Sequence, residues 1–172
     1  MTTRVLVEGR PGAGKTTAAR RLVGILQARG VPVQGFTTEE IRQGGQRVGF
    51  AVNAVDGHRA VLAHVDLDGP PRVGKYGVDL TAFEQVALPA LGDTATGGVV
   101  VIDELGKMEL GSAAFRDAVQ RLVETHCSLV ATVHVHRHPF TDALKRRIEV
   151  TRLDTSNRDR LPAELAERLT PD

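Results

Sequence analysis

The sequence predicts an α/β fold of three layers, in which helices cover both faces of a mostly parallel β-sheet. Short apolar runs rich in β-branched residues, typical of strands buried on both faces, recur along the chain. They alternate with longer segments of helical periodicity, as in parallel sheets connected by helices. A third observation is an Asp-Gly pair between two alternating segments, 47–55 and 59–65, which adds a small antiparallel hairpin.

The composition indicates one globular domain spanning residues 1–172. Apolar residues make up 41% of the chain and charged residues 25%, enough to build a sizeable core. The net charge of +1 and the aromatic content of 3% disfavour a nucleic-acid partner and an anionic membrane, and we expect a monomer. A single cysteine, Cys127, no apolar run of membrane-spanning length and no signal-peptide pattern point to a cytoplasmic location.

The first predicted elements enclose a glycine-rich turn. A short buried strand covers 4–8, and apolar residues at helical spacing predict a helix over 17–29. The second strand, 31–38, leads into the hairpin.

Strands and helices then alternate to the end of the chain. The segment 66–77, rich in glycine and proline, is predicted to be a loop. The remaining elements are a helix over 79–91, a strand over 99–102, a helix from an N-cap at Ser112 to about 125, a strand over 129–133, a helix over 139–147, a strand over 148–153 and a helix from about 162.

The turn between the first strand and the first helix matches the phosphate-binding loop pattern G-x-x-x-x-G-K-[ST]. Its glycines let the backbone approach a phosphate chain, and the following helix start adds unpaired N–H groups. Lys15 is expected to contact the β- and γ-phosphates, and Thr16 to bind Mg²⁺. The predicted phosphate-binding residues are Gly9, Arg10, Pro11, Gly12, Ala13, Gly14, Lys15, Thr16 and Thr17.

The apolar strand over 99–102 ends in two carboxylates, Asp103 and Glu104. Asp103 is expected to hold Mg²⁺ through water, as the acidic residue after such a strand does in P-loop proteins. Glu104 would orient the water that attacks the γ-phosphate, because phosphoryl transfer depends on positioning and charge neutralisation. This arrangement predicts that the strand over 129–133 lies between the strand over 4–8 and the strand over 99–102.

Several polar residues compete for places at the same sheet edge, where ligands of such folds gather. Glu39 could reach the site, or it could pair with Arg42 in a loop. Thr132 and His134 end the next strand and could sense the γ-phosphate. His134, His136 and His138 could form a metal site or a surface trio. Lys107, Arg10 and Arg158 could be cations that stabilise the transition state, or solvated side chains. Residues 145–147 could form a patch that binds RNA or an acidic partner, or a solvated helix end.

The sequence resembles a known family in five segments: residues 9–17, residues 35–39 with Arg42, residues 73–76 with Val78, residues 103–110 (D-E-L-G-K-M-E-L) and residues 157–159. Together these are similar to the small nucleoside-triphosphatases that include the cancer-related enzyme and its thermophile relatives. Leu105 stands where isoleucine is usual. The resemblance implies a RecA-like P-loop fold, Mg²⁺-dependent hydrolysis of several nucleoside triphosphates, and nucleotide contacts by Val101, Ile102, Asp103, Glu104, Leu105, Gly106 and Lys107.

The residues leave three functions open: triphosphate hydrolysis, with Lys15 and Glu104 as the catalytic groups; a small-molecule or nucleotide kinase; and a nucleotide-switched module that binds RNA or a protein. Glu104 favours hydrolysis, because it suits water activation. No N/T-K-x-D guanine motif is present, so we expect ATP, GTP and other triphosphates to be accepted. Asn157 and Arg158 follow the last strand and could flank the base, although Asn is also a common turn residue.

Overall fold

The structure, a computed structural model, describes residues 2–172. Over this range it contains five α-helices, one short 3-10 helix and a single nine-stranded sheet. The strands are β1 (Arg4–Glu8), β2 (Val33–Gln43), β3 (Gln46–Ala54), β4 (Arg59–His64), β5 (Arg72–Val73), β6 (Tyr76–Val78), β7 (Val99–Leu105), β8 (Ser128–Val133) and β9 (Glu149–Arg152). The helices are α1 (Lys15–Ala28), α2 (Leu80–Ala90), η1 (Glu109–Gly111), α3 (Ala113–Glu124), α4 (Pro139–Arg147) and α5 (Leu161–Leu169).

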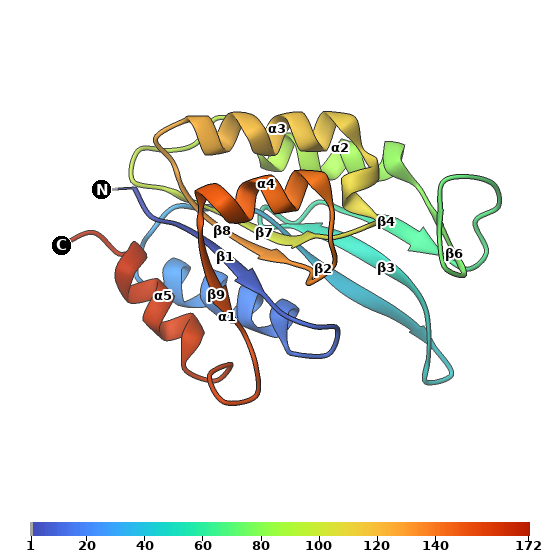
Figure 1. Cartoon of the computed structure of the whole chain (residues 1–172), viewed down its shortest axis with the longest axis horizontal. Helices are drawn as coiled ribbons and strands as arrows, with labels where there is room; N and C mark the ends of the chain where they lie inside the picture. The colour runs from blue at the N-terminus through green and yellow to red at the C-terminus, as the bar shows by residue number, and fades with distance from the viewer. Residues whose placement is uncertain (1) are drawn as a thin grey trace.

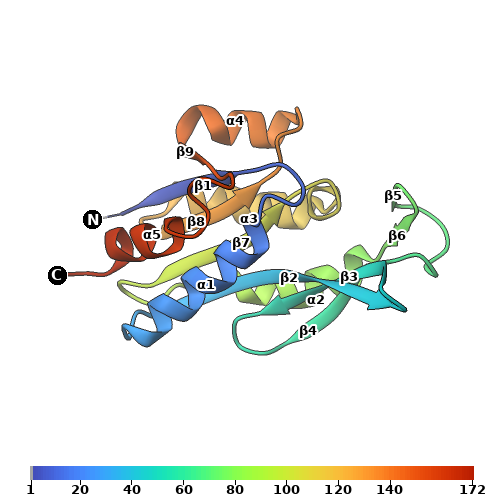
Figure 2. The ribbon, with the colours of Figure 1, turned by 90° about the horizontal axis from the view of Figure 1, so that it is seen from below.

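Helices cover both faces of the sheet, which confirms the three-layer α/β prediction (Figures 1 and 2). On one face, α1 and α5 bury apolar side chains such as Leu22 and Leu165 against β1, β7 and β8. On the other face, α2 and α3 enclose a cluster of three phenylalanines, Phe36, Phe83 and Phe115, whose ring centroids are 5.1–5.8 Å apart. The sheet is therefore fixed from both sides near the ends of its central strands.

The parallel half of the sheet has the order β2-β7-β8-β1-β9. Strand β8 pairs with β1 on one side and with β7 on the other. The predicted position of the strand over 129–133 is thus confirmed. As a consequence, the residues that follow β1, β7 and β8 meet at one edge of the sheet.

The prediction of a mostly parallel sheet is wrong, because the antiparallel part is larger than a hairpin. Only the start of β2 pairs parallel with β7, and the rest of this strand pairs antiparallel with β3. The antiparallel half continues through β4 and β6 to β5. The sequence hides these pairings because residues 39–43 are polar except for Ile41, and because β5 and β6, which flank Gly74 (φ +58°), are too short to show a periodic pattern.

Two further boundaries differ near the candidate site. Helix α1 begins at Lys15 rather than at Thr17, because Gly14 adopts φ +103° and acts as the N-cap. Strand β7 continues through Asp103 and Glu104 to Leu105 rather than ending at Ile102. The predicted N-cap at Ser112 is confirmed, since its hydroxyl accepts a hydrogen bond from the Phe115 N–H at 3.0 Å. Within residues 2–172, no helix has both the length and the apolar character needed to span a bilayer.

Candidate functional site

The glycine-rich loop connects β1 to α1 and is built for close approach to its backbone. Gly12 and Gly14 have φ values of +81° and +103°, a region that side chains with a Cβ rarely adopt. The loop is anchored to the neighbouring strand, because the Gly9 N–H donates to the Val133 carbonyl at the end of β8 (3.3 Å). Since the first N–H groups of α1 have no partner within the helix, they are available to an anion.

Lys15 points back over this loop rather than into solvent. Its ammonium donates to the Gly9 carbonyl at 2.6 Å and lies 3.1 Å from Glu104 Oε2. The Lys15 side chain is only 9% exposed, whereas Glu104 is 30% exposed. The two residues predicted as catalytic are therefore in direct contact, although 89 positions separate them in the sequence.

Asp103 is buried, and both of its carboxylate oxygens are held in place. Oδ2 accepts from the N–H and the hydroxyl of Thr38, each at 3.2 Å, and Oδ1 accepts from the Thr132 hydroxyl at 2.7 Å. These three hydrogen bonds fix the orientation of the carboxylate, which can in turn orient the water shell of a cation. Thr16 lines the same cavity as Glu104, the residue next to Asp103, so the donor set fits a hydrated Mg²⁺ held mainly by phosphates, as in other phosphate-transfer sites.

A second glutamate, Glu109, approaches Glu104 from the turn that follows β7. A Cβ added at Gly106 would lie 2.7 Å from Glu104 Oε1 and 3.0 Å from Glu109 Oε2, so both carboxyl groups crowd the same point. Burial raises the pKa of Glu109 well above its usual range, and the negative charge of Glu104 raises it further. The two neighbouring carboxyl groups are thus in different environments, one buried and one open to the cavity.

The end of β8 places Thr132 and His134 at the same edge. Thr132 is engaged with Asp103, and it is therefore not available to a phosphate. His134 is 6% exposed, and its Nε2 lies 3.1 Å from the Thr141 hydroxyl of α4. Burial lowers the pKa of His134 to about 4, and the positive charge of Lys145 contributes.

The three histidines form a ring cluster rather than a metal site. The ring centroid of His134 lies 5.6 Å from that of His136 and 6.3 Å from that of His138. His138 Nδ1 accepts from the Phe140 N–H and caps α4. In the part of the chain that the structure describes, no group of three or more histidine, cysteine or acidic side chains could hold a metal ion.

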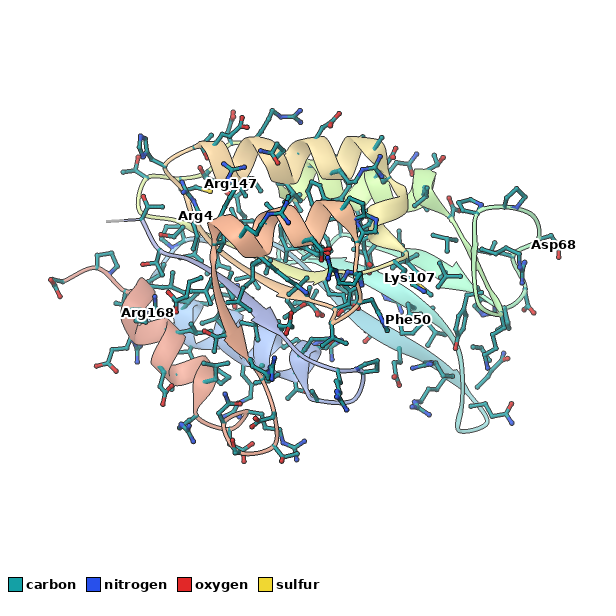
Figure 3. The ribbon with its side chains drawn as sticks, viewed as in Figure 1. Arg4, Phe50, Asp68, Lys107, Arg147 and Arg168 are labelled. Carbon is teal, nitrogen blue, oxygen red and sulfur yellow. The ribbon has the colours of Figure 1, made fainter. Side chains whose placement is uncertain are left out.

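Lys15, Glu104, Glu109 and His134 border one open cavity of about 790 Å³. It extends from the loop past Glu104 to the antiparallel half of the sheet, where Phe50 and Arg47 of β3 form its wall. Figure 3 shows Lys107 and Phe50 on the same side of the molecule, where both line this cavity. The lining includes Pro11, Gly12, Gly14, Lys15, Thr16, Thr17, Arg20, Thr38, Glu39, Glu40, Arg42, Glu104, Met108, Glu109, His134 and His136.

Some predicted residues lie outside the cavity lining. Arg10 is exposed, and Val101 and Ile102 are buried in β7. Asn157 uses its amide within its own turn, because Nδ2 donates to the Arg152 carbonyl and Oδ1 accepts from the Asp154 N–H. Arg158 comes close to the loop, since its Cδ lies 3.5 Å from where a Gly14 Cβ would be.

Two pairings differ from those expected. Glu39 lies within β2 and pairs with Arg59 at 2.9 Å, whereas Arg42 pairs with Glu40 at 2.7 Å. Lys145 is not a solvated helix end: it pairs with Glu8 at 2.7 Å and donates to the His134 carbonyl at 2.9 Å. The Glu39–Arg59 and Lys145–Glu8 pairs join segments that are distant in the sequence, so no local pattern could reveal them.

Sequence reasoning did not assign a role to several residues at the site. Thr38 donates two hydrogen bonds to Asp103, and Arg20 donates to the Thr38 carbonyl at 2.7 Å. Glu109 belongs to the segment of residues 103–110, but its burial beside Glu104 depends on the turn after β7. The position of Thr38 at the end of a predicted strand was the one available signal.

Comparison with known proteins identifies relatives of this chain. A family model described as NTPase matches residues 4–166. The chain is 39% identical over 165 residues to the nucleoside-triphosphatase THEP1 of Thermotoga petrophila, covering 94% of this chain and 90% of the relative. It is 47% identical over 140 residues to the cancer-related nucleoside-triphosphatase of Homo sapiens, covering 76% and 74%.

Two solved structures share the fold along almost the whole chain. The crystal structure of THEP1 from the hyperthermophile Aquifex aeolicus has a TM-score of 0.88 at 30% identity and covers 98% of this chain and 100% of that one. The solution structure of a human cancer-related nucleoside triphosphatase has a TM-score of 0.85 at 38% identity and covers 98% and 97%. The resemblance noted in the sequence is confirmed: the chain belongs to this family of nucleoside-triphosphatases and is an enzyme of that class.

Proposed function

We propose that the chain, as a single monomeric domain, hydrolyses nucleoside 5′-triphosphates to the diphosphate and phosphate, with Mg²⁺ and with little selectivity for the base. The observation that carries this proposal is the contact between Lys15 and Glu104 at the mouth of the glycine-rich loop. It brings a phosphate-binding cation and a water-orienting carboxylate to one point. The order of the parallel strands, with β8 between β1 and β7, is the one expected of a RecA-like P-loop protein.

The loop would hold the phosphate chain through its N–H groups, and Lys15 would move from Glu104 to the β- and γ-phosphates. A terminal phosphate carries more negative charge than a carboxylate, so this exchange is favourable for the ammonium. Glu104 then loses its partner and is free to accept a hydrogen bond from water. Binding of the substrate thus prepares the group that activates the nucleophile.

In the chemical step, the water oxygen bonds to the γ-phosphorus while the bond from that phosphorus to the β–γ bridging oxygen breaks. Glu104 orients the water and takes its proton, and the diphosphate leaves with the bridging oxygen. Thr16 and Asp103 are the residues that would hold Mg²⁺, which when bound would supply positive charge to the phosphates. Lys107, at the cavity wall, is placed to add positive charge.

The test is phosphate release from ATP, GTP, CTP and UTP with and without Mg²⁺. Lys15→Ala should lose measurable turnover, because it removes the cation that contacts the β- and γ-phosphates. Arg21→Ala is the matched control: this exposed residue of α1 does not line the cavity, and the variant should keep its activity. Unchanged turnover in Lys15→Ala would show that the loop is not the substrate site.

A kinase remains the second candidate, because the cavity continues beyond Glu104 toward Phe50 and Arg47. This space could admit an acceptor whose hydroxyl replaces the attacking water. The same assay separates the two functions. A hydrolase releases phosphate in the absence of any acceptor, whereas a kinase needs one and transfers the phosphoryl group to it.

A further inference from the structure

Strand β2 separates from β7 just before the candidate site. Its parallel pairing with β7 ends at Phe36, opposite Ile102, whereas its antiparallel pairing with β3 continues to Gln43. Beyond Phe36, the edge of β2 that faces β7 therefore has no pairing strand within residues 2–172. The buried backbone groups on this edge need other partners, because an unpaired N–H or carbonyl away from water is costly.

Thr38 lies on this edge, and side chains take the place of the missing strand. Its N–H and its hydroxyl each donate to Asp103 Oδ2 at 3.2 Å, and these are the donors that Oδ2 has within residues 2–172. Its carbonyl accepts a hydrogen bond from Arg20 Nη2 at 2.7 Å. Hydrogen bonds with an ionised donor are roughly twice as strong as those between neutral groups. The buried Thr38 is thus held at both of its peptide groups.

Arg20 belongs to α1, the helix that begins at Lys15 of the glycine-rich loop. Its side chain lines the candidate cavity and is exposed, so it does not serve the core. Its hydrogen bond to Thr38 connects the helix of the loop to the carboxylate that is expected to hold Mg²⁺. The contacts run from Arg20 to Thr38 and from Thr38 to Asp103, so they link the phosphate-binding and metal-holding parts of the site.

Loss of the Arg20 contact would affect the direction of the Asp103 carboxylate. Only two backbone torsions separate the N–H of a residue from its carbonyl, so fixing the carbonyl of Thr38 restricts where its N–H points. Both hydrogen bonds to Oδ2 come from Thr38, whereas Oδ1 is held by the Thr132 hydroxyl at 2.7 Å. A loosened Thr38 would therefore leave the carboxylate anchored at Oδ1 and free to turn about it.

A cation at the cavity wall has a second reading, because Arg20 could contact the phosphates itself. The two readings differ in the sign of their effect on a bound metal ion. A nearby positive charge repels a metal cation, so removing a phosphate-contacting arginine should leave metal binding unchanged or tighter. Removing an arginine that positions Asp103 should weaken metal binding. The 2.7 Å hydrogen bond to the Thr38 carbonyl favours the positioning role, because it directs the guanidinium toward β2.

We propose that Arg20 is a positioning residue of the metal site: by holding the Thr38 carbonyl, it keeps the Thr38 donors on Asp103 and thereby fixes the carboxylate that orients the water shell of Mg²⁺. This inference rests on the proposed function and adds a residue that touches neither the substrate nor the metal. Residues beyond the ligands of a metal contribute to its affinity by orienting the groups that do contact it. Arg20 does so from the helix that also carries the phosphate-binding Lys15.

The test measures metal binding itself rather than turnover. Mn²⁺ accepts the same oxygen ligands as Mg²⁺, and its free concentration is measured by electron paramagnetic resonance. It is titrated into the complex with AMPPNP, a non-hydrolysable triphosphate analogue, with the enzyme in excess so that the nucleotide stays bound. Arg20→Met and Arg20→Lys form the matched pair, because both new side chains are unbranched but only lysine keeps a cationic donor. Arg21→Ala, at an exposed position of α1, is the control.

We expect Arg20→Met to weaken Mn²⁺ binding by roughly tenfold, the lower end of what the loss of an outer-shell partner costs. Arg20→Lys should stay within about threefold of the parent, and Arg21→Ala should match the parent. Unchanged or tighter binding in Arg20→Met would overturn the inference, because an arginine that contacts phosphate, or that only supports the fold, gives that result. An equal loss in Arg20→Met and Arg20→Lys would overturn it as well.

The effect should also depend on the carboxylate that Arg20 positions. In the Asp103→Ala background, Arg20→Met should change the Mn²⁺ affinity by less than about twofold, and an undiminished effect there would overturn the inference. If melting curves show that Asp103→Ala does not fold, the matched pair at Arg20 decides alone. Lys15→Ala separates this role from the proposed function. Analogue binding that survives Lys15→Ala overturns both, whereas binding that disappears there while Arg20→Met keeps the parental Mn²⁺ affinity overturns the role of Arg20 alone.

Discussion

The ammonium of Lys15 has two competing anionic partners: the Glu104 carboxylate, which lies 3.1 Å away, and the phosphate chain of the proposed substrate. Glu104 therefore opposes substrate binding even though it serves the chemistry. Removing its charge should strengthen binding of a triphosphate and weaken catalysis at the same time. Such opposite effects are typical of a group that acts mainly in the transition state.

Glu104→Gln should bind Mg²⁺–AMPPNP up to about fivefold more tightly, because partly exposed ion pairs contribute up to about 1 kcal/mol. Single-turnover hydrolysis of ATP should slow by about 10²-fold or more, the scale of a positioned base. Titration and quenched-flow measurements check the two halves. Weaker binding with normal hydrolysis would show that another residue acts as the general base, and Glu39→Gln would then be the next variant to measure.

Asp103→Asn should show a different pattern from Glu104→Gln. Asparagine keeps one acceptor oxygen, but its amide group faces the donors of Thr38 or Thr132. Both the affinity for Mg²⁺–triphosphate and the rate should fall, and the melting temperature should drop. The comparison of the two variants by Mg²⁺ titration of nucleotide binding separates metal positioning from water activation.

Glu109 is expected to make stability fall as pH rises. Its pKa in the folded chain lies above the ordinary value of 4.5, so its stabilising effect is complete below pH 4.5 and is lost as pH rises toward the folded pKa. Glu109→Gln is neutral at every pH, and its melting temperature should exceed that of the parent by a margin that widens from pH 5 to pH 8. Glu167→Gln, on the exposed face of α5, is the control and should show no such trend.

The candidate site residues that could be predicted from the sequence are those that belong to a fixed motif or follow an apolar strand. Lys15, Asp103 and Glu104 were identified because loop spacing and strand-end position imply their chemistry, and the structure brings them together. Three features could not be predicted, because each depends on contacts between different segments of the chain. They are the hydrogen bonds from Thr38 to Asp103, the burial of Glu109, and the contact between His134 and Thr141 of α4.

At the scale of elements, β2 joins the two halves of the sheet, and its Gly35 makes the parallel pairing possible. Gly35 has φ +113°, and an added Cβ would lie 1.9 Å from the Val101 carbonyl oxygen of β7. No side chain can avoid a backbone atom at that distance without moving one of the strands. The pairing of β2 with β7 also positions Thr38 against Asp103.

Gly35→Ala should therefore lower the free energy of unfolding by about 3 kcal/mol or more, since overpacking and backbone strain add. Gly24→Ala is a matched control in α1, where no atom lies within 4 Å of the added Cβ. It should stabilise the chain by up to about 1 kcal/mol, because alanine is the better helix former. Denaturant unfolding of both variants checks the contrast; equal effects would contradict the close approach of β2 to β7.

Strands with a continuous apolar stretch were predicted, whereas short and polar ones were not. The strands β1, β7 and β8 each contain such a stretch because both of their faces are covered, although β7 continues beyond its apolar part to Leu105. The end of β2 and the strands β5 and β6 lie in the half-open antiparallel part, where polar residues are tolerated. Their pairing partners, rather than their own sequence, make them strands.

At the scale of the whole molecule, the cavity joins the phosphate loop to the antiparallel half of the sheet. Near the loop, both polar atoms of the Asn157 amide bond within their own turn, and the Arg158 side chain passes beside Gly14. Binding energy should therefore come mainly from the phosphates, which all triphosphates share.

Affinity for the four common triphosphates should accordingly agree within roughly tenfold, about 1.4 kcal/mol. Because a ligand that binds only the folded state raises its stability by mass action, each should raise the melting temperature when present well above its dissociation constant. For a chain of this size, a difference of 1.4 kcal/mol corresponds to about 3–6 °C, so the shifts with non-hydrolysable analogues at equal concentration should fall within that span. Asn157→Ala should change all four shifts alike, whereas Lys15→Ala should abolish them. A shift with one base only, lost in Asn157→Ala or Arg158→Ala, would reveal a base readout at the turn after β9.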